Sequence, residues 1–344
     1  MEGALPAAHR RPRPFAFSIH SFGCERMAFL HAAAAVAEGA AVGETKDSSV
    51  SAALHDPLRR VGVLGGRPGL RRSLGSVYAG CVTRFLGGFC GVRSRTVPTL
   101  EWDAFSDSGG MAVTRDGAAL LVTERERSHC LYVFDVTTGK ALRTMGGKGT
   151  APLQFFKPHR VCITDDDVVF VADSGNNRIQ VLTPQLGFYG FVGVGQLLAP
   201  FGVCANEHVI VVSNTNCISV FQRSDGAFVR RFGAGTLLGP LGLCFIGKTG
   251  QIAVANSGTD CVAVFTLEGK FIRYIKHDKL VAPADVASSA AGELVVGAFG
   301  SKVFVYSASD EMLHDFGDCF FGRVAIHGGA IFVQSCKGLT TVFT

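Results

Sequence analysis

The feature that most constrains the fold is a motif of strand, polar turn and strand that recurs about every forty residues along the chain. Its fullest copy is the run Val171–Leu182, whose turn contains Asp173, Gly175 and Asn176. A repeat of this length builds a fold from similar units that stack or close into a ring, because one unit alone cannot bury its apolar face. We therefore expect a repeat architecture and interpret individual motifs within it.

Each unit contains four short apolar segments separated by turns rich in Gly, Asp and Asn. The first segments of six successive units begin at Gly110, Arg160, Gly202, Gly242, Asp285 and Arg323. Four strands per unit, rich in β-branched and aromatic residues, are typical of a β-propeller blade. The sequence thus predicts an all-β fold, a six-bladed β-propeller over residues 97–344.

The last unit supplies only three strands, of which the third is Thr340–Phe343. An unpaired strand edge favours aggregation, so a closed ring needs a fourth strand from elsewhere in the chain. Residues 99–106 lie just before the first unit and have a strand-like pattern. We expect this segment to pair with Thr340–Phe343 and close the ring.

The region before the propeller has a different composition and no repeat. Residues 1–99 contain 13 Lys/Arg and 6 Asp/Glu, whereas residues 100–344 contain 20 and 22. Without a periodic apolar face, residues 1–96 are expected to form a poorly ordered basic extension. Organellar targeting is the alternative, because the start of the chain is rich in Arg and poor in acids. The near-neutral repeats carry no basic footprint, so we expect no DNA binding.

The cysteines indicate packing rather than metal ligation. Of the eleven, Cys162, Cys204 and Cys244 share one position in successive first strands, where the other units have Ala. A position that accepts only small residues is typical of tight packing, and the chain has no Cys-x-x-Cys pair. We expect reduced thiols, an intracellular and cytoplasmic location, and no metal or other cofactor. No uncharged apolar run is long enough to span a bilayer, so membrane insertion is not expected.

Two runs carry a resemblance to a known family. Phe156–Val161 and Phe170–Val181 resemble the NHL repeat, with weaker similarity at Pro200–Val203 and Pro240–Leu243. The resemblance implies a six-bladed propeller but specifies function poorly, since one fold hosts many functions. Family members with a zinc RING and a coiled coil are ubiquitin ligases. This chain shows neither feature, so the resemblance implies at most a substrate-binding adaptor.

The turn residues have a structural interpretation. Asp173 can accept hydrogen bonds from the backbone of its turn, and Gly175 and Asn176 tolerate positive φ. Asn214 and Asn256 occupy the place of Asp173 in later units. We expect all five to cap turns rather than to bind a ligand.

The candidate binding residues are basic and lie outside the repeated pattern. In a propeller, the loops between the second and third strands emerge on the same face as the loops between blades. We expect this loop face to gather six side chains that could bind an acidic peptide or RNA phosphates: Arg125, Arg127, Lys157, His159, Arg160 and Arg178.

The favoured function is a non-catalytic scaffold that binds a protein or peptide on this face. The alternative is binding of single-stranded RNA through the basic rim, which the near-neutral charge of the propeller disfavours. A third hypothesis, a small-molecule hydrolase or lyase in the central channel, lacks a catalytic set. Lyases related to the NHL family bind zinc through several inner-strand histidines, and here only His159 stands at such a position.

Overall fold

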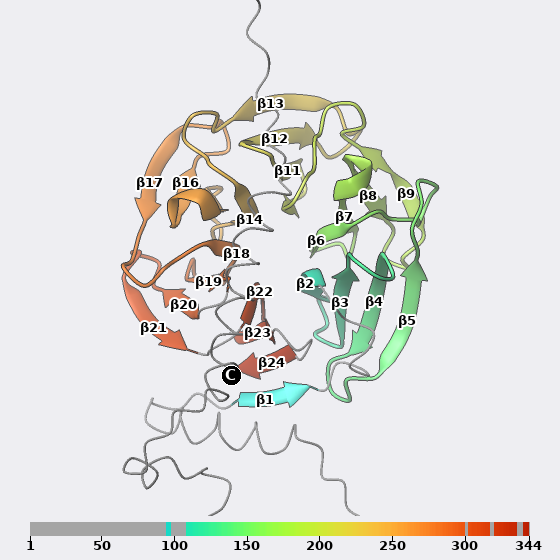
Figure 1. Ribbon diagram of the computed structural model, residues 1–344, viewed down its shortest axis with the longest axis horizontal. Coiled ribbons are helices and arrows are strands. Elements are labelled where there is room, and N and C mark those ends of the chain that lie inside the picture. Colours follow the sequence, from blue (N-terminus) through green and yellow to red (C-terminus); the bar gives the residue numbers. More distant parts are fainter. Residues whose placement is uncertain (1–93, 98–107, 300–301, 317–319, 336–339, 344) are drawn as a thin grey trace, which may run out of the picture. The chain divides into compact units, whose positions relative to one another are not determined.

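Six four-stranded antiparallel sheets, arranged as blades around a central axis, contain the described strands (Figure 1). The computed structural model describes residues 94–97, 108–299, 302–316, 320–335 and 340–343, all within the second of the two units into which the chain divides, Arg72–Thr344. The predicted all-β propeller of six blades is confirmed. The predicted extension over residues 1–96 lies outside the described residues except for residues 94–96, which belong to the strand Ser94–Val97.

In the first five blades, the strands follow one another along the chain from the inner to the outer edge. The first three blades comprise β2 (Ser108–Val113), β3 (Ala119–Glu124), β4 (Cys130–Asp135) and β5 (Ala141–Gly146); β6 (Pro158–Ile163), β7 (Val169–Asp173), β8 (Arg178–Leu182) and β9 (Phe188–Val192); and β10 (Val203–Ala205), β11 (Val209–Asn214), β12 (Cys217–Gln222) and β13 (Phe228–Phe232). The fourth and fifth comprise β14 (Pro240–Phe245), β15 (Ile252–Asn256), β16 (Cys261–Phe265) and β17 (Phe271–Ile275); and β18 (Pro283–Ser288), β19 (Leu294–Ala298), β20 (Val303–Tyr306) and β21 (Met312–Phe316).

The sixth blade joins the two ends of the described chain. It comprises β22 (Phe320–His327), β23 (Ala330–Ser335), β24 (Thr340–Phe343) and, as its outer strand, β1 (Ser94–Val97). β1 runs antiparallel to β24, with Ser94 opposite Phe343 and Val97 opposite Thr340. The sequence predicts residues 99–106 at this place. The strand that pairs with β24 is instead Ser94–Val97, and residues 98–107 lie outside the described part of the chain.

The order of the blades places the second opposite the fifth. The inner strand β6 contacts β2 and β10, whereas β18 contacts β14 and β22. Glycine permits the closest approaches between inner strands: a Cβ atom on Gly110 would lie 2.7 Å from the Cα of Arg160. The inner strands therefore converge on a narrow axis that a few long side chains can cross.

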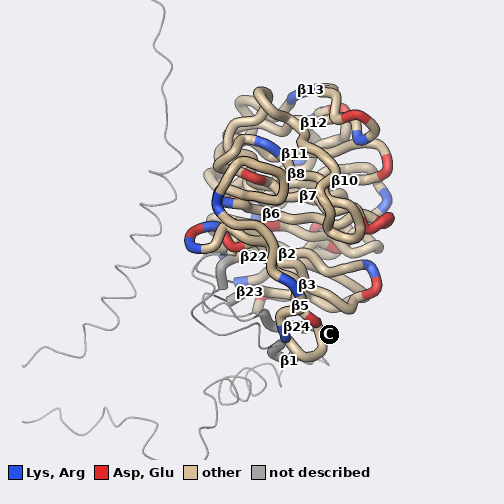
Figure 2. Tube along the Cα trace, turned by 90° about the vertical axis from the view of Figure 1, so that its right-hand side faces the viewer, with Lys and Arg blue, Asp and Glu red and all other residues tan. Residues whose placement is uncertain are grey.

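The alternating strand directions give the ring two distinct faces (Figure 2). Loops between the second and third strands of a blade, together with the loops between blades, form the loop face. Loops between the first and second and between the third and fourth strands form the opposite face. Hydrogen bonds connect the two kinds of loop on the loop face, such as that from the Gly258 N–H to the Leu238 carbonyl (2.8 Å).

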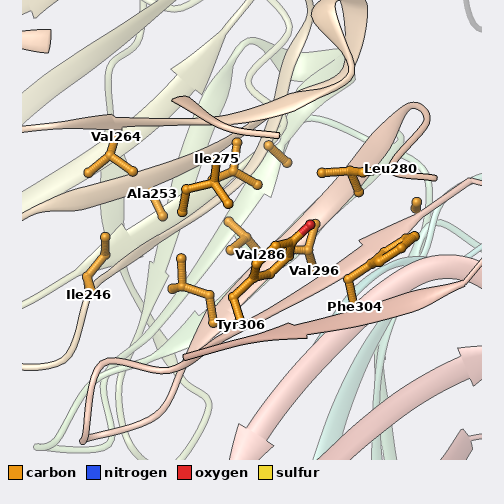
Figure 3. Close-up of a cluster of buried hydrophobic side chains, with 13 residues drawn as sticks. Ile246, Ala253, Val264, Ile275, Leu280, Val286, Val296, Phe304 and Tyr306 are labelled. Atoms are coloured by element: carbon orange, nitrogen blue, oxygen red, sulfur yellow. The ribbon is translucent and has the colours of Figure 1, made fainter. Parts of the chain in front are cut away.

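The hydrophobic core consists of clusters between neighbouring blades. The cluster between the fourth and fifth blades includes Val264, Ile275, Val296 and Tyr306 (Figure 3). In β7 and β8 every residue is buried, because both faces of a blade are covered by its neighbours. Burial of a large apolar side chain contributes about 2 kcal/mol, so the ring is held together through its blade junctions. None of the helices in the described ranges has the length and apolar character needed to cross a bilayer.

Candidate functional site

The turn of the second blade is built around the buried carboxylate of Asp173. Its oxygens accept hydrogen bonds from the backbone N–H of Phe156 (2.8 Å), from Asn176 Nδ2 (2.9 Å) and from Arg178 Nε (2.8 Å). A buried carboxylate is stable only when it is paired and hydrogen-bonded in this way. Asp173 therefore fixes the turn and the inter-blade loop that precedes its blade.

Arg178 belongs to the interior of this network. Only 7% of Arg178 is exposed; its guanidinium donates to the carbonyl of Thr150 (2.7 Å) and lies over the ring of Phe191, 3.8 Å from its centroid. Our expectation that Arg178 adds to an exposed basic rim is therefore wrong. The acceptors that surround it leave no surface for a partner.

Gly175 is required for a different reason from the one that we expected. The left-handed backbone of this turn is at Asn177, with φ of 57°, and not at Gly175 or Asn176. A Cβ atom on Gly175 would lie 2.4 Å from Cδ1 of Phe156, and the Gly175 N–H donates to the Phe156 carbonyl (2.7 Å). Gly175 thus allows the turn to approach the inter-blade loop, and Asn176 bonds to that loop at the carbonyl of Gly149 (2.8 Å).

The same hydrogen bond holds the inter-blade loop in three successive blades. The residue that ends the second strand accepts from the backbone N–H of an apolar residue in the preceding loop, at 2.8, 2.9 and 2.7 Å in the pairs Asp173–Phe156, Asn214–Leu198 and Asn256–Leu238. The turn residues Asn214 and Asn256 therefore have the same bond to the loop as Asp173.

A second repeated bond ties each loop to the blade before it. The residue after the apolar one has left-handed backbone, and its N–H is held by a side chain of the previous turn, in the pairs Lys157–His129, Ala199–Asn177, Gly239–Asn216 and Ala282–Asp260. Left-handed backbone costs a residue other than Gly about 1–2 kcal/mol. In the loops of Phe156, Leu198 and Leu238 the two bonds together offset this cost and fix the loop's conformation.

These fixed loops place an apolar side chain in solvent at equivalent positions. In the loops before the third and fourth blades, the first of two apolar residues is buried and the second is exposed: Leu197 is 5% exposed and Leu198 61%, while Leu237 is 4% exposed and Leu238 52%. Val281 is 48% exposed at the same position, and Phe156 is half-buried beneath Lys148, whose Nζ lies 5.0 Å from the ring centroid. We call the set Phe156, Leu198, Leu238 and Val281 the apolar arc.

Three of the predicted basic residues lie on the loop face next to the start of this arc. Arg127 is exposed, and Arg125 and Lys157 are partly exposed. Lys157 Nζ lies 3.5 Å from Glu126 Oε1, an exposed ion pair that contributes little to stability. The carboxylate of Glu124 caps this turn by accepting from the Ser128 N–H (2.6 Å). Arg125, Arg127 and Lys157 thus remain as the surface part of the predicted site.

His159 and Arg160 instead belong to the central channel. His159 is 5% exposed, its ring packs on Phe201 at 4.3 Å between centroids, and its Nε2 lies 3.5 Å from Arg125 Nη1. Burial, followed by the positive charges of Arg125, Arg323 and Lys157, holds the pKa of His159 well below its usual value. The imidazole is therefore neutral at pH 7. Its assignment to an exposed docking rim is wrong because the inner strand buries it.

Arg160 crosses the axis of the ring. Its guanidinium forms an ion pair with Asp285 on the opposite blade, and the Asp285 carboxylate also accepts from the Val324 N–H (3.2 Å). The side chains of Arg160 and Asp285 are 11% and 0% exposed. This pair links the second, fifth and sixth blades, so Arg160 is not part of an exposed rim either.

The channel thiols have the properties of packing residues. Burial raises the pKa of Cys162 and of Cys244 to about 12, and that of Cys204 is also raised well above its usual value. Metal ligation needs the thiolate, which these pKa values disfavour. Among the described residues, no cluster of three or more His, Cys, Asp or Glu side chains could hold a metal ion.

Comparison with known proteins supports the repeat assignment. The family model of the NHL repeat matches residues 155–182, and the resemblance to the NHL-repeat family is confirmed. "Protein brain tumor" of Drosophila melanogaster is 32% identical over 142 residues, an alignment that covers 37% of this chain and 13% of that protein. The chain thus spans about an eighth of that relative's length.

Solved structures show the same fold at low sequence identity. A streptogramin B lyase is 14% identical with a TM-score of 0.53, and the match covers 74% of this chain and 97% of the lyase. A catalytically inactive virginiamycin B lyase from Staphylococcus aureus, with quinupristin, is 12% identical with a TM-score of 0.54, covering 74% and 99%. In a nidogen/laminin complex one chain is 17% identical with a TM-score of 0.52, covering 61% and 79%. At these identities the likeness concerns the fold alone.

Proposed function

We propose that this chain, a propeller of the NHL-repeat family, is a non-catalytic scaffold that binds a protein or peptide segment on its loop face. The observation that carries the proposal is the apolar arc, in which three loops present an exposed apolar side chain and a fourth presents the half-buried Phe156 at the same repeated position. Large apolar side chains on rigid backbone are suited to binding because little conformational entropy is lost on association.

The charges beside the arc favour a partner segment that combines apolar and acidic side chains. Arg127 and Lys157 lie near its beginning. Lys276 is exposed in the loop that carries Val281, where Lys279 Nζ lies 4.0 Å from Asp315 Oδ2. Complementary charge fixes register and accelerates encounter, while apolar contact supplies most of the affinity. In this proposal the apolar arc makes the docking contacts, and the neighbouring basic side chains orient the partner segment.

RNA binding has less support. Burial of His159, Arg160 and Arg178 halves the basic set on which that alternative rested, and Glu126 pairs with Lys157. A channel enzyme also has less support, because the ion pair of Arg160 with Asp285 crosses the axis. The adaptor hypothesis agrees with a binding scaffold, and it requires a ligase partner in addition.

The experiment compares capture of partners by the full chain and by two variants, with and without nuclease. Leu198→Glu with Leu238→Glu disrupts the apolar arc, and Leu142→Glu is the matched control, since Leu142 is 61% exposed on the outer strand β5. We expect a nuclease-resistant protein partner that the arc variant loses at least tenfold and the control retains. A partner released by nuclease would favour RNA, and equal capture by both variants would contradict the proposal.

A further inference from the structure

A cavity of about 500 Å³ lies between the first and second blades, on the face opposite the loop face. Its floor is apolar and includes Leu121, Val133 and Val169. Its mouth includes the charged residues Arg115, Asp116 and Asp167. The volume is within the usual range for binding of a small molecule or a side chain.

The next blade junction contains the same arrangement with its space filled. Between the second and third blades, the guanidinium of Arg223 forms two hydrogen bonds with Asp166, at 2.7 and 2.6 Å, and lies 5.7 Å from the ring centroid of Phe170. Arg223 also donates to the carbonyl of Asn206 (3.0 Å). This junction thus holds an arginine side chain between an apolar ring and a carboxylate.

The residues at the two junctions correspond one to one. Asp116 and Asp166 occupy the same loop position, and each accepts from the hydroxyl of the Thr two residues earlier, at 2.6 and 2.7 Å. Leu121 takes the place of Phe170, three residues before the end of the second strand. Pro184 takes the place of Arg223, because the third strands of the two blades have the same β-bulge, at Val181/Leu182 and Val220/Phe221, and each residue follows its bulge by two positions. Asp116, Leu121 and Pro184 all line the cavity.

The cavity therefore occupies the position that the side chain of Arg223 fills at the next junction. Hydrogen bonds from Thr114 and from the Ala118 N–H lower the pKa of Asp116, so its carboxylate is charged at neutral pH, as that of Asp166 is. The other charged side chains at the mouth are Asp167 and Arg115, and Arg115 donates to the carbonyl of Asp165 (2.7 Å). Two carboxylates thus face one guanidinium that already has an acceptor.

We infer that this cavity binds an arginine side chain of a partner polypeptide, with its aliphatic stem on Leu121 and Val169 and its guanidinium on Asp116. The stem matches the apolar floor, and the planar guanidinium matches a carboxylate better than a lysine ammonium does. This site lies on the other face from the apolar arc and does not depend on the proposed function of the loop face.

The test titrates the full chain with N-acetyl-arginine N-methylamide and follows the methyl resonances of Leu121, Val133 and Val169. The citrulline analogue is the matched control, because it has the same shape without the charge. We expect saturable shifts with the arginine probe and binding weaker by about tenfold or more with the citrulline probe. Equal responses to the two probes, or no shift with arginine, would overturn the inference.

Two variants test the correspondence between the junctions. Pro184→Arg should supply the missing guanidinium from within the chain and abolish the response to the probe. Arg223→Ala should open the second junction and add probe-dependent shifts at Phe170. Asp116→Asn keeps the shape of the mouth. It should weaken binding of the arginine probe and leave binding of the citrulline probe unchanged. A Pro184→Arg protein that still binds arginine like the unmodified chain would contradict the inference.

Discussion

The six basic residues that the sequence groups at one rim belong to two regions of the molecule. His159, Arg160 and Arg178 are buried in the channel and beneath the turns, whereas Arg125, Arg127 and Lys157 reach the loop face. The buried set is paired with carboxylates or packed against rings, and it holds blades together. The difference shows that a basic residue in a repeat protein is a candidate for partner binding only if it does not lie on an inner strand or in a buried turn network.

The largest expected effect on stability comes from the ion pair in the central channel. Removing one partner of the Arg160–Asp285 pair leaves a buried charge unpaired, which costs about 3–5 kcal/mol. We expect Asp285→Ala to lower the free energy of unfolding by this amount in urea denaturation. The double variant Arg160→Met with Asp285→Leu should lose less than the single variant, because neither charge remains. If the Asp285→Ala chain were as stable as the unmodified one, the buried basic residues would not stabilise the ring more than those on the loop face.

A smaller loss is expected beneath the turn of the second blade. Asp173→Asn keeps the shape but removes the charge that binds Arg178, which costs about 2 kcal/mol. The equivalent residues Asn214 and Asn256 already are amides, so Asn214→Asp serves as the reciprocal control. Thermal unfolding should show a lowered midpoint for Asp173→Asn. An unchanged midpoint would mean that the Arg178 network does not stabilise this blade.

The pH dependence of stability probes His159 separately. Because burial lowers its folded pKa below the usual value of 6.5, the unfolded chain binds this proton more readily. The contribution of the neutral imidazole to the free energy of unfolding is fully present above pH 6.5. It decreases by about 1 kcal/mol for each pH unit below that value. His159→Gln should lose less stability between pH 7.5 and 5.5 than the unmodified chain. Identical slopes for the two proteins would contradict burial of a neutral histidine.

The smallest effects on stability are expected on the loop face. Arg127→Ala and Lys157→Ala should change the free energy of unfolding by less than about 0.5 kcal/mol, since these side chains have little buried contact. Urea titration at two salt concentrations measures this directly. A loss above about 2 kcal/mol in either variant would place it with the interior set and remove it from the proposed docking surface.

The repeat itself could be predicted because its signal is local. Strand spacing and the turn at Asp173 indicated the blades, and Phe156, Leu198, Leu238 and Val281 each precede the residue before a proline, a pattern that could have revealed the apolar arc. The pairing of Arg160 with Asp285 could not be predicted, because it depends on which blades face each other after the ring closes. The outer strand Ser94–Val97 was missed because residues 99–106 have the stronger aromatic pattern.

Docking of a partner on the apolar arc can be followed through the leucine methyl resonances of the full chain in complex with a captured partner. We expect the resonances of Leu198 and Leu238 to shift. Those of Leu142 and Leu313, which are 61% and 42% exposed on outer strands, should remain unchanged. Shifts confined to Leu142 and Leu313, with Leu198 and Leu238 unaffected, would contradict docking on the arc.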